Sequence, residues 1–101
     1  MPYELMISPA AFRETGNAYD YHEIQSPGLG ERFLKSLEDA YQKLAISPQH
    51  YGYINSRKDI RDMKIETFPF IIVFQTLEDQ VLILRIINTN RDPLTNTSEQ
   101  Q

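Results

Sequence analysis

The side chains of this sequence that could do chemistry are mainly cations in its C-terminal half. Four of them fall within eight positions: Arg57, Lys58, Arg61 and Lys64. Guanidinium and ammonium groups bind carboxylates and phosphates, and they can stabilise negative charge that develops during a reaction. Because Asp59 and Asp62 are interleaved with these cations, a solvated strand of alternating charge explains the pattern as well as a binding site does.

Arg85 is a second candidate, because it interrupts the apolar run at residues 81–87. A charge inside such a run must be paired, lie at a strand end or line a functional surface. Strand alternation predicts which residues share its face: Val81, Ile83 and Ile87. A structural ion pair with Asp92 or Glu66 explains Arg85 as well as a functional role does. Arg91 could equally belong to a turn that an ion pair with Asp92 holds before Pro93.

Other common catalytic constellations are missing from the sequence. There is no cysteine, which excludes disulfides, thiolate catalysis and cysteine-bound metals. His22 and His50 are isolated, so a metal site is not expected. Gly28 and Gly30 lack the third glycine and the preceding strand of a phosphate-binding loop. No serine lies in a nucleophile motif, so we expect neither a cofactor nor conventional hydrolase chemistry.

Length and composition indicate a single globular domain. With 101 residues the chain can build one core but not two. We expect the domain to span residues 1–93 and a polar, frayed tail to follow at 94–101. The net charge of −4 argues against strong direct DNA binding, which needs many cations. Neither a membrane-spanning run nor a signal peptide is visible, so we expect a soluble, cytoplasmic protein.

The N-terminal half is expected to form a strand and two helices. The strand at residues 3–7 ends at Ser8 and Pro9, which are typical of a helix N-cap and of the first helical position. The first helix has a weak stripe and should be irregular near Gly16; the stripe is Phe12, Thr15 or Gly16, Tyr19 and Glu23. After a break at 26–30, the second helix has clear apolar spacing and stops at Pro48. Its apolar positions are Leu29, Phe33, Leu37, Ala40 or Tyr41, and Leu44.

The C-terminal half is expected to form three strands, after an aromatic, loop-like segment at residues 50–56. The apolar runs 68–74 and 81–87 are short and rich in Ile, Val and Phe, as in a sheet covered on at least one face. The polar segment 77–80 between them predicts an antiparallel hairpin. The order β-α-α-β-β-β predicts an α+β fold with two N-terminal helices packed on a mainly antiparallel sheet.

Several segments recur in an order and spacing that are fairly specific together. They are Ile60-Arg61, Phe68-Pro-Phe-Ile-Ile-Val-Phe74, Val81-Leu-Ile-Leu-Arg-Ile-Ile87, Asn90-Arg91-Asp-Pro93, Ser26-Pro-Gly-Leu-Gly-Glu-Arg-Phe33 and Leu44 to Pro48. With these segments the chain resembles the RelE/ParE family of toxins from type II toxin–antitoxin systems, often called plasmid-stabilisation proteins. The likeness covers roughly residues 3–93 and implies a cognate antitoxin as partner.

Two departures from the family pattern bear on activity. Asn88 stands where family members commonly carry a histidine, and no tyrosine or histidine follows residue 53. RNA cleavage by 2′-hydroxyl attack needs a proton acceptor, a proton donor and stabilisation of the phosphorane charge. Arg61 and Arg85 could stabilise the charge, but the acceptor would have to be Lys58 or Lys64 as a neutral amine. The resemblance therefore implies the ParE-like branch, whose members are understood to inhibit DNA gyrase by binding it.

Two other functions stay open at this point. One is a RelE-like, ribosome-dependent endonuclease acting on mRNA, with Arg61, Arg85, Lys58 and Lys64 as its catalytic candidates. The other is a degenerate toxin that is retained as an interaction module. For binding to a target, the candidates are Arg61, Arg85, Arg91 and Asn88.

The antitoxins of this family wrap their toxins with a segment that folds on binding. Exposed aromatic residues are the candidates for this contact: Phe12, Tyr19, Tyr21, Tyr51 and Tyr53. These side chains could equally cover the edge of the core.

Overall fold

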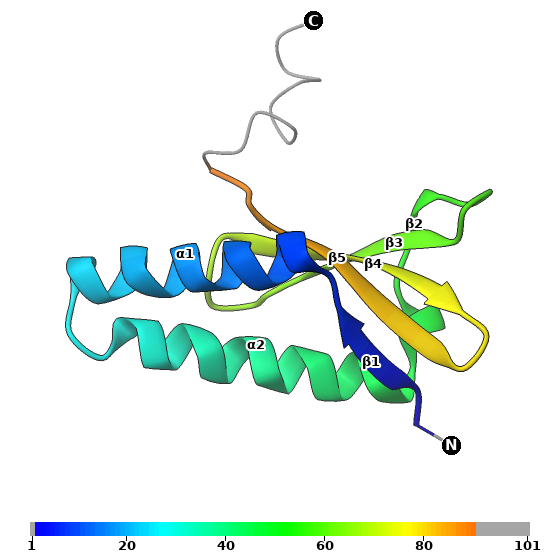
Figure 1. The fold of residues 1–101 in the computed structure, drawn as a ribbon, viewed down its shortest axis with the longest axis horizontal. Helices are drawn as coiled ribbons and strands as arrows, with labels where there is room; N and C mark the ends of the chain where they lie inside the picture. Colours follow the sequence, from blue (N-terminus) through cyan, green and yellow to red (C-terminus); the bar gives the residue numbers. More distant parts are fainter. Residues whose placement is uncertain (1, 91–101) are drawn as a thin grey trace, which may run out of the picture.

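The computed structural model describes residues 2–90, and within them the chain has the predicted α+β fold (Figure 1). The elements are β1 (Glu4–Ile7), α1 (Pro9–Gln25), α2 (Leu29–Ile46), the 3₁₀ helix η1 (Pro48–His50), β2 (Tyr53–Asn55), β3 (Ile60–Lys64), β4 (Phe70–Leu77) and β5 (Gln80–Asn88). The predictions for Arg91, for Asp92 and for the tail at 94–101 lie outside the described residues.

The strands within residues 2–90 form one sheet with the order β1-β5-β4-β3-β2. β1 runs parallel to β5 and the other neighbours are antiparallel, as predicted for a mainly antiparallel sheet. β4 and β5 form the predicted hairpin, in which Glu78 takes a φ of 55°. The prediction of a loop at 50–56 is wrong in part, because Tyr53 and Asn55 pair with β3. A strand this short carries no readable alternation, which is why the sequence did not indicate it.

Helix α1 begins as predicted and continues without a break. The Ser8 side chain accepts a hydrogen bond from the Ala11 N–H at 3.0 Å, and Pro9 occupies the first turn. The buried face consists of Ala11, Ala18 and His22. It is not the predicted stripe, since Phe12 is 75 % exposed. Small side chains on the inner face allow α1 to lie close to the sheet.

The turn between the helices is built around glycines. Glu23 Oε1 accepts hydrogen bonds from the N–H groups of Gly28 and Gly30, at 2.9 and 2.8 Å, and so caps the start of α2. Gly28 has a φ of 89°, which a residue with a Cβ rarely adopts. A Cβ on Gly30 would lie 2.8 Å from the Tyr19 carbonyl oxygen. These glycines therefore let α2 approach α1 closely.

A cluster of aromatic rings joins this helical pair to the sheet. His22 of α1 stacks on Phe33 of α2 with ring centroids 5.1 Å apart. Both rings contact Phe70, the first residue of β4, and Phe68, which lies just before that strand. His22 Nδ1 lies 2.7 Å from the Ala18 carbonyl oxygen and is the donor, since a carbonyl only accepts. The buried imidazole is therefore part of the core.

Candidate partner-binding surfaces

Arg61 is buried where η1, β2 and β3 meet, with only 9 % of the residue exposed. Nη1 donates to the carbonyl oxygens of Gln49 and Tyr51, at 3.1 and 2.7 Å. Nη2 donates to the Tyr53 hydroxyl at 2.8 Å, and Nε donates to Asp59 Oδ1 at 3.3 Å. Cζ also lies 4.0 Å from the centroid of the Tyr53 ring, within the range of a cation–π interaction.

These contacts give Arg61 a structural task. The guanidinium has donors in a fixed planar array, and it joins the carbonyl oxygens of Gln49 and Tyr51 to β2 and β3. The predicted role of Arg61 in target binding or catalysis stays a prediction, but its donors point into this chain rather than toward a ligand. The side chain that it presents to solvent is Tyr53, which is 53 % exposed.

Arg85 lies beside a bulge in β5. The pairing of β4 with β5 shifts by one residue at Leu84, and such an extra residue reverses the alternation of the strand beyond it. The prediction that Arg85 shares a face with Val81, Ile83 and Ile87 is therefore wrong for Val81 and Ile83, which lie before the bulge. Ile86 joins those two residues in the core instead.

Glu14 of α1 binds both a backbone N–H beside the bulge and the guanidinium of Arg85. Oε1 accepts a hydrogen bond from the Ile86 N–H at 2.8 Å, and Oε2 accepts one from Arg85 Nε at 2.7 Å. Arg85 Nη2 lies 2.5 Å from the same Oε2. The described partner of Arg85 is thus Glu14 rather than the predicted Glu66. Sequence analysis missed it because the two residues are 71 positions apart.

The candidate nuclease residues are held in different places. The sheet register sets Arg61 beside Phe74 and Arg85 beside Val73, and neighbouring residues of a strand point to opposite faces. Lys58 lies in the loop between β2 and β3, and Lys64 is exposed at the end of β3. Asn88, at the end of β5, accepts a hydrogen bond from the Asn90 N–H at 2.8 Å. The described arrangement does not direct these side chains at one phosphate.

The aromatic candidates are also divided between regions. Phe12 and Tyr19 are seven positions apart on α1 and therefore lie on one side of it. Tyr21 packs edge-on against His22. Tyr51 packs edge-on against the core residue Phe74, whereas Tyr53 lies on β2. Figure 1 shows α1 and β2 toward opposite ends of the long axis.

A groove lies between α1 and α2, beside Tyr19, and its walls are partly apolar and partly charged. Its volume is about 450 Å³, and it is lined by Thr15, Glu31, Leu34, Lys35, Leu37, Glu38 and Tyr41. Tyr19 donates a hydrogen bond to Glu31 at 3.2 Å along it. The Tyr41 hydroxyl is buried and has no hydrogen-bond partner among the described residues. Burial raises the pKa of Tyr41 to about 12.

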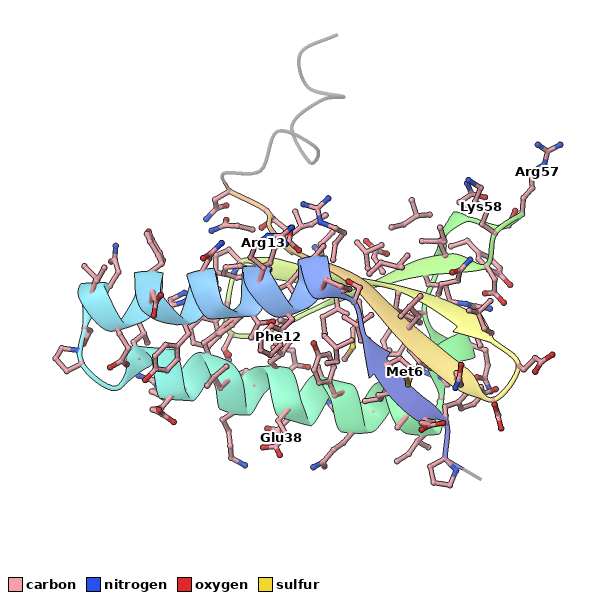
Figure 2. The ribbon with its side chains drawn as sticks, in the orientation of Figure 1. Met6, Phe12, Arg13, Glu38, Arg57 and Lys58 are labelled. Atoms are coloured by element: carbon pink, nitrogen blue, oxygen red, sulfur yellow. The ribbon has the colours of Figure 1, made fainter. Side chains whose placement is uncertain are left out.

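Strand β1 carries further exposed apolar side chains. It is an edge strand, and its Met6 and Ile7 are each 43 % exposed. Figure 2 labels Met6 on β1, Phe12 on α1 and Glu38 on α2. Sequence analysis proposed none of Met6, Ile7 and Tyr41 as a site residue, and it named Tyr41 only as an alternative apolar position of α2. Their exposure or burial depends on strand order and helix packing, which local spacing does not reveal.

The described part of the chain shows neither a metal-binding cluster nor a membrane-spanning helix. No three His, Asp or Glu side chains of residues 2–90 are grouped so that they could hold a metal ion. In the same residues, no helix combines the length and the apolar character needed to span a membrane.

Comparison with known proteins agrees with the fold. A family model described as the ParE toxin of type II toxin–antitoxin system, parDE, matches residues 5–93. A solved structure titled "Chromosomal ParDE TA system from P. aeruginosa" has a similar chain, with a TM-score of 0.74 and 19 % identity. The match covers 85 % of this chain and 95 % of that one. This likeness shows the fold alone. The search of curated proteins gave no match.

Proposed function

Because the chain belongs to the ParE toxin family of type II toxin–antitoxin systems, we propose that it inhibits DNA gyrase by binding it and that a cognate antitoxin neutralises it. The observation that carries this proposal is the family match over residues 5–93. Gyrase is the target that the sequence resemblance implies for the ParE-like branch. On this proposal the chain catalyses no reaction and inhibits its target by binding alone.

The positions of the cations support binding over RNA cleavage. A nuclease needs a proton acceptor and cations that converge on the reacting phosphate. Arg61 donates to carbonyl oxygens of its own chain, and Arg85 is paired with Glu14. Releasing Arg61 would remove the donor to two backbone carbonyl oxygens, and releasing Arg85 would break its ion pair with Glu14. No described arrangement favours the RelE-like alternative.

The surface proposed for the antitoxin is the groove between α1 and α2, together with Phe12 and Tyr19. A disordered segment that folds on binding commonly lays the apolar face of a helix into such a groove. Phe12 would offer a large apolar contact, since it is 75 % exposed on α1.

Expression of the chain alone in bacteria, followed by a gyrase assay, tests the proposal. We expect growth arrest, a DNA-damage response and loss of supercoiling by purified gyrase, each reversed by coexpressed antitoxin. Normal growth together with unaffected supercoiling would contradict it. Primer extension on translated messages distinguishes gyrase inhibition from RNA cleavage. Cuts that vanish in Arg61→Ala or Arg85→Ala would indicate a RelE-like endonuclease. Antitoxin binding without toxicity would indicate a degenerate toxin.

A further inference from the structure

The β2–β3 hairpin is a projecting element that the fold itself does not need for its core. Its loop, residues 56–59, connects the last two strands of the sheet at the edge opposite to β1. Figure 2 shows Arg57 and Lys58 at the tip of this hairpin, pointing away from the body of the molecule. No buried side chain lies between residues 52 and 60. The conformation of the hairpin must therefore be fixed by something other than core packing.

Hydrogen bonds within the turn and to β4 fix the conformation of the hairpin backbone. Asn55 Oδ1 accepts from the Lys58 N–H at 3.1 Å, and Ser56 O accepts from the Asp59 N–H at 3.3 Å. From β4, the Gln75 side chain donates to Lys58 O at 2.8 Å, and the Thr76 N–H donates to Asp59 O at 3.3 Å. Two carbonyls of the turn, those of Lys58 and Asp59, are therefore anchored to the neighbouring strand. The backbone at the tip is preorganised, so that binding through it costs less conformational entropy.

The side chains at the tip remain available. Arg57 and Lys58 are exposed, and neither side chain has a hydrogen-bond or ion-pair partner among the described residues. The nearest carboxylate in sequence, Asp59, is held by Arg61. Beside the tip, Tyr53 and Ile54 of β2 are 53 % and 55 % exposed. Two cations and two large apolar side chains thus share one short, rigid hairpin in a chain of net charge −4.

We propose that this hairpin is the surface through which the chain contacts its protein target, and that the matching surface of the target is acidic with an apolar recess. This inference rests on the proposed function. Opposite charge guides association and fixes register, while an aromatic side chain in a recess provides most of the affinity. Arg61 is then a positioning residue, because its hydrogen bond and ring contact hold Tyr53 in place.

A nucleic-acid partner fits the hairpin less well. Affinity for a phosphate backbone grows with the number of phosphates that are neutralised, and the tip offers only Arg57 and Lys58. The body behind it is acidic overall. The apolar residues beside the cations have no use on a phosphate backbone, but they are typical of the centre of a protein interface.

The test compares charge-reversed chains in a supercoiling assay with purified gyrase. The Arg57→Glu/Lys58→Glu variant should need at least about tenfold more protein for half-inhibition than the wild type. Arg57→Lys/Lys58→Arg should retain inhibition, since it keeps the charges. The matched control is Arg32→Glu/Lys43→Glu on α2, which makes the same change in net charge and should inhibit normally. Antitoxin affinity, measured by calorimetry, should be unchanged in all variants and reports that each is folded.

Three results would overturn the proposal that the β2–β3 hairpin contacts the protein target. Equal inhibition by the wild type and the Arg57→Glu/Lys58→Glu variant would do so while leaving the proposed function intact. No inhibition by the wild type would remove both. Fluorescence anisotropy with duplex DNA alone separates the other class of partner: DNA binding by the wild type that is lost in the charge-reversed variant would show that the hairpin binds nucleic acid instead.

Discussion

The two ends of this molecule are held together by different interactions. At the helical end, α1 and α2 approach each other at Gly30 and bury a cluster of rings that includes His22 and Phe33. At the other end, η1, β2 and β3 are joined by the guanidinium of Arg61, which donates to carbonyl oxygens on the η1–β2 segment. One end depends on apolar burial and the other on directed hydrogen bonds from one side chain.

This difference predicts different responses to substitution. Apolar burial at the helical end contributes to the single core, so its loss should lower the stability of the whole domain. The contacts of Arg61 lie at the edge of the sheet, so their loss should open the β2–β3 hairpin before the core unfolds. The functional surfaces follow the same division. The proposed antitoxin groove lies at the helical end. The proposed target contact lies at the other end, where Arg61 joins η1, β2 and β3.

Replacing Phe33 should have the largest effect. Phe33 is fully buried and contacts the rings of His22, Phe68 and Phe70. Phe33→Ala should lower the free energy of unfolding by about 3–5 kcal/mol, measured by urea denaturation. Phe12→Ala is the control and should change it by less than about 0.5 kcal/mol. A loss below about 1 kcal/mol in Phe33→Ala would show that this cluster does not form the core.

Replacing Arg61 should have the next largest effect, and a local one. Arg61→Met keeps the aliphatic packing but leaves the carbonyls of Gln49 and Tyr51 without their donor, at a cost of about 2–3 kcal/mol. Hydrogen exchange should accelerate in β2 and β3 more than in α2 and β5. Arg61→Lys should rescue little, because an ammonium cannot reproduce the planar array of donors. Uniform acceleration over all strands would contradict a local role.

Antitoxin binding can show which end of the molecule the partner uses. Tyr19 lies at the helical end and Tyr53 at the hairpin end, and sequence analysis proposed both as contacts. If the partner lies in the groove between the helices, Tyr19→Ala should weaken binding by about 1–3 kcal/mol and Tyr53→Ala should not. Calorimetric titration with the antitoxin peptide measures this. Unchanged affinity in both variants would show that the antitoxin binds elsewhere.

Two glycines provide a matched pair for the close approach of the helices. A Cβ on Gly30 would meet Tyr19 and Glu23 atoms at 2.7–2.8 Å, whereas a Cβ on Gly16 would meet nothing within 4 Å. Gly30→Ala should therefore destabilise by roughly 1–2 kcal/mol. Gly16→Ala should stabilise by about 0.5–1 kcal/mol, because alanine favours a helix interior. Thermal unfolding would measure both, and equal signs would argue against close packing at Gly30.

The sequence was informative where the interactions are local. Ser8 and Pro9 marked the start of α1, and the spacing from Phe33 to Leu44 identified the buried face of α2. The same reasoning failed where a contact joins distant segments. The Glu14–Arg85 pair, the bulge at Leu84 and the burial of Arg61 all depend on how the sheet is assembled. Two of the cations that sequence analysis suggested as site residues, Arg61 and Arg85, therefore have partners within the chain.

The smallest predicted change in stability comes from the Tyr41 hydroxyl, which can be compared with that of Tyr53. The Tyr53 hydroxyl accepts a hydrogen bond from Arg61, although its ring is half exposed. The Tyr41 hydroxyl is buried beside the groove and has no partner among the described residues. A buried hydroxyl without a partner destabilises the folded state, and burial also favours its neutral form.

Tyr41→Phe should therefore be neutral or stabilising by up to about 1 kcal/mol at pH 7. The pKa of Tyr41 rises from 10.0 to about 12 in the folded chain, so the folded state holds this proton at a pH where the unfolded state has released it. The stability that depends on this proton is complete below pH 10 and is lost as the pH rises toward 12. Across that range the wild type should lose stability relative to Tyr41→Phe, which has no group to ionise. Urea denaturation of both chains at neutral and alkaline pH would measure the difference. If Tyr41→Phe instead lost more than about 1 kcal/mol at pH 7, the hydroxyl would have to be hydrogen-bonded in the folded chain.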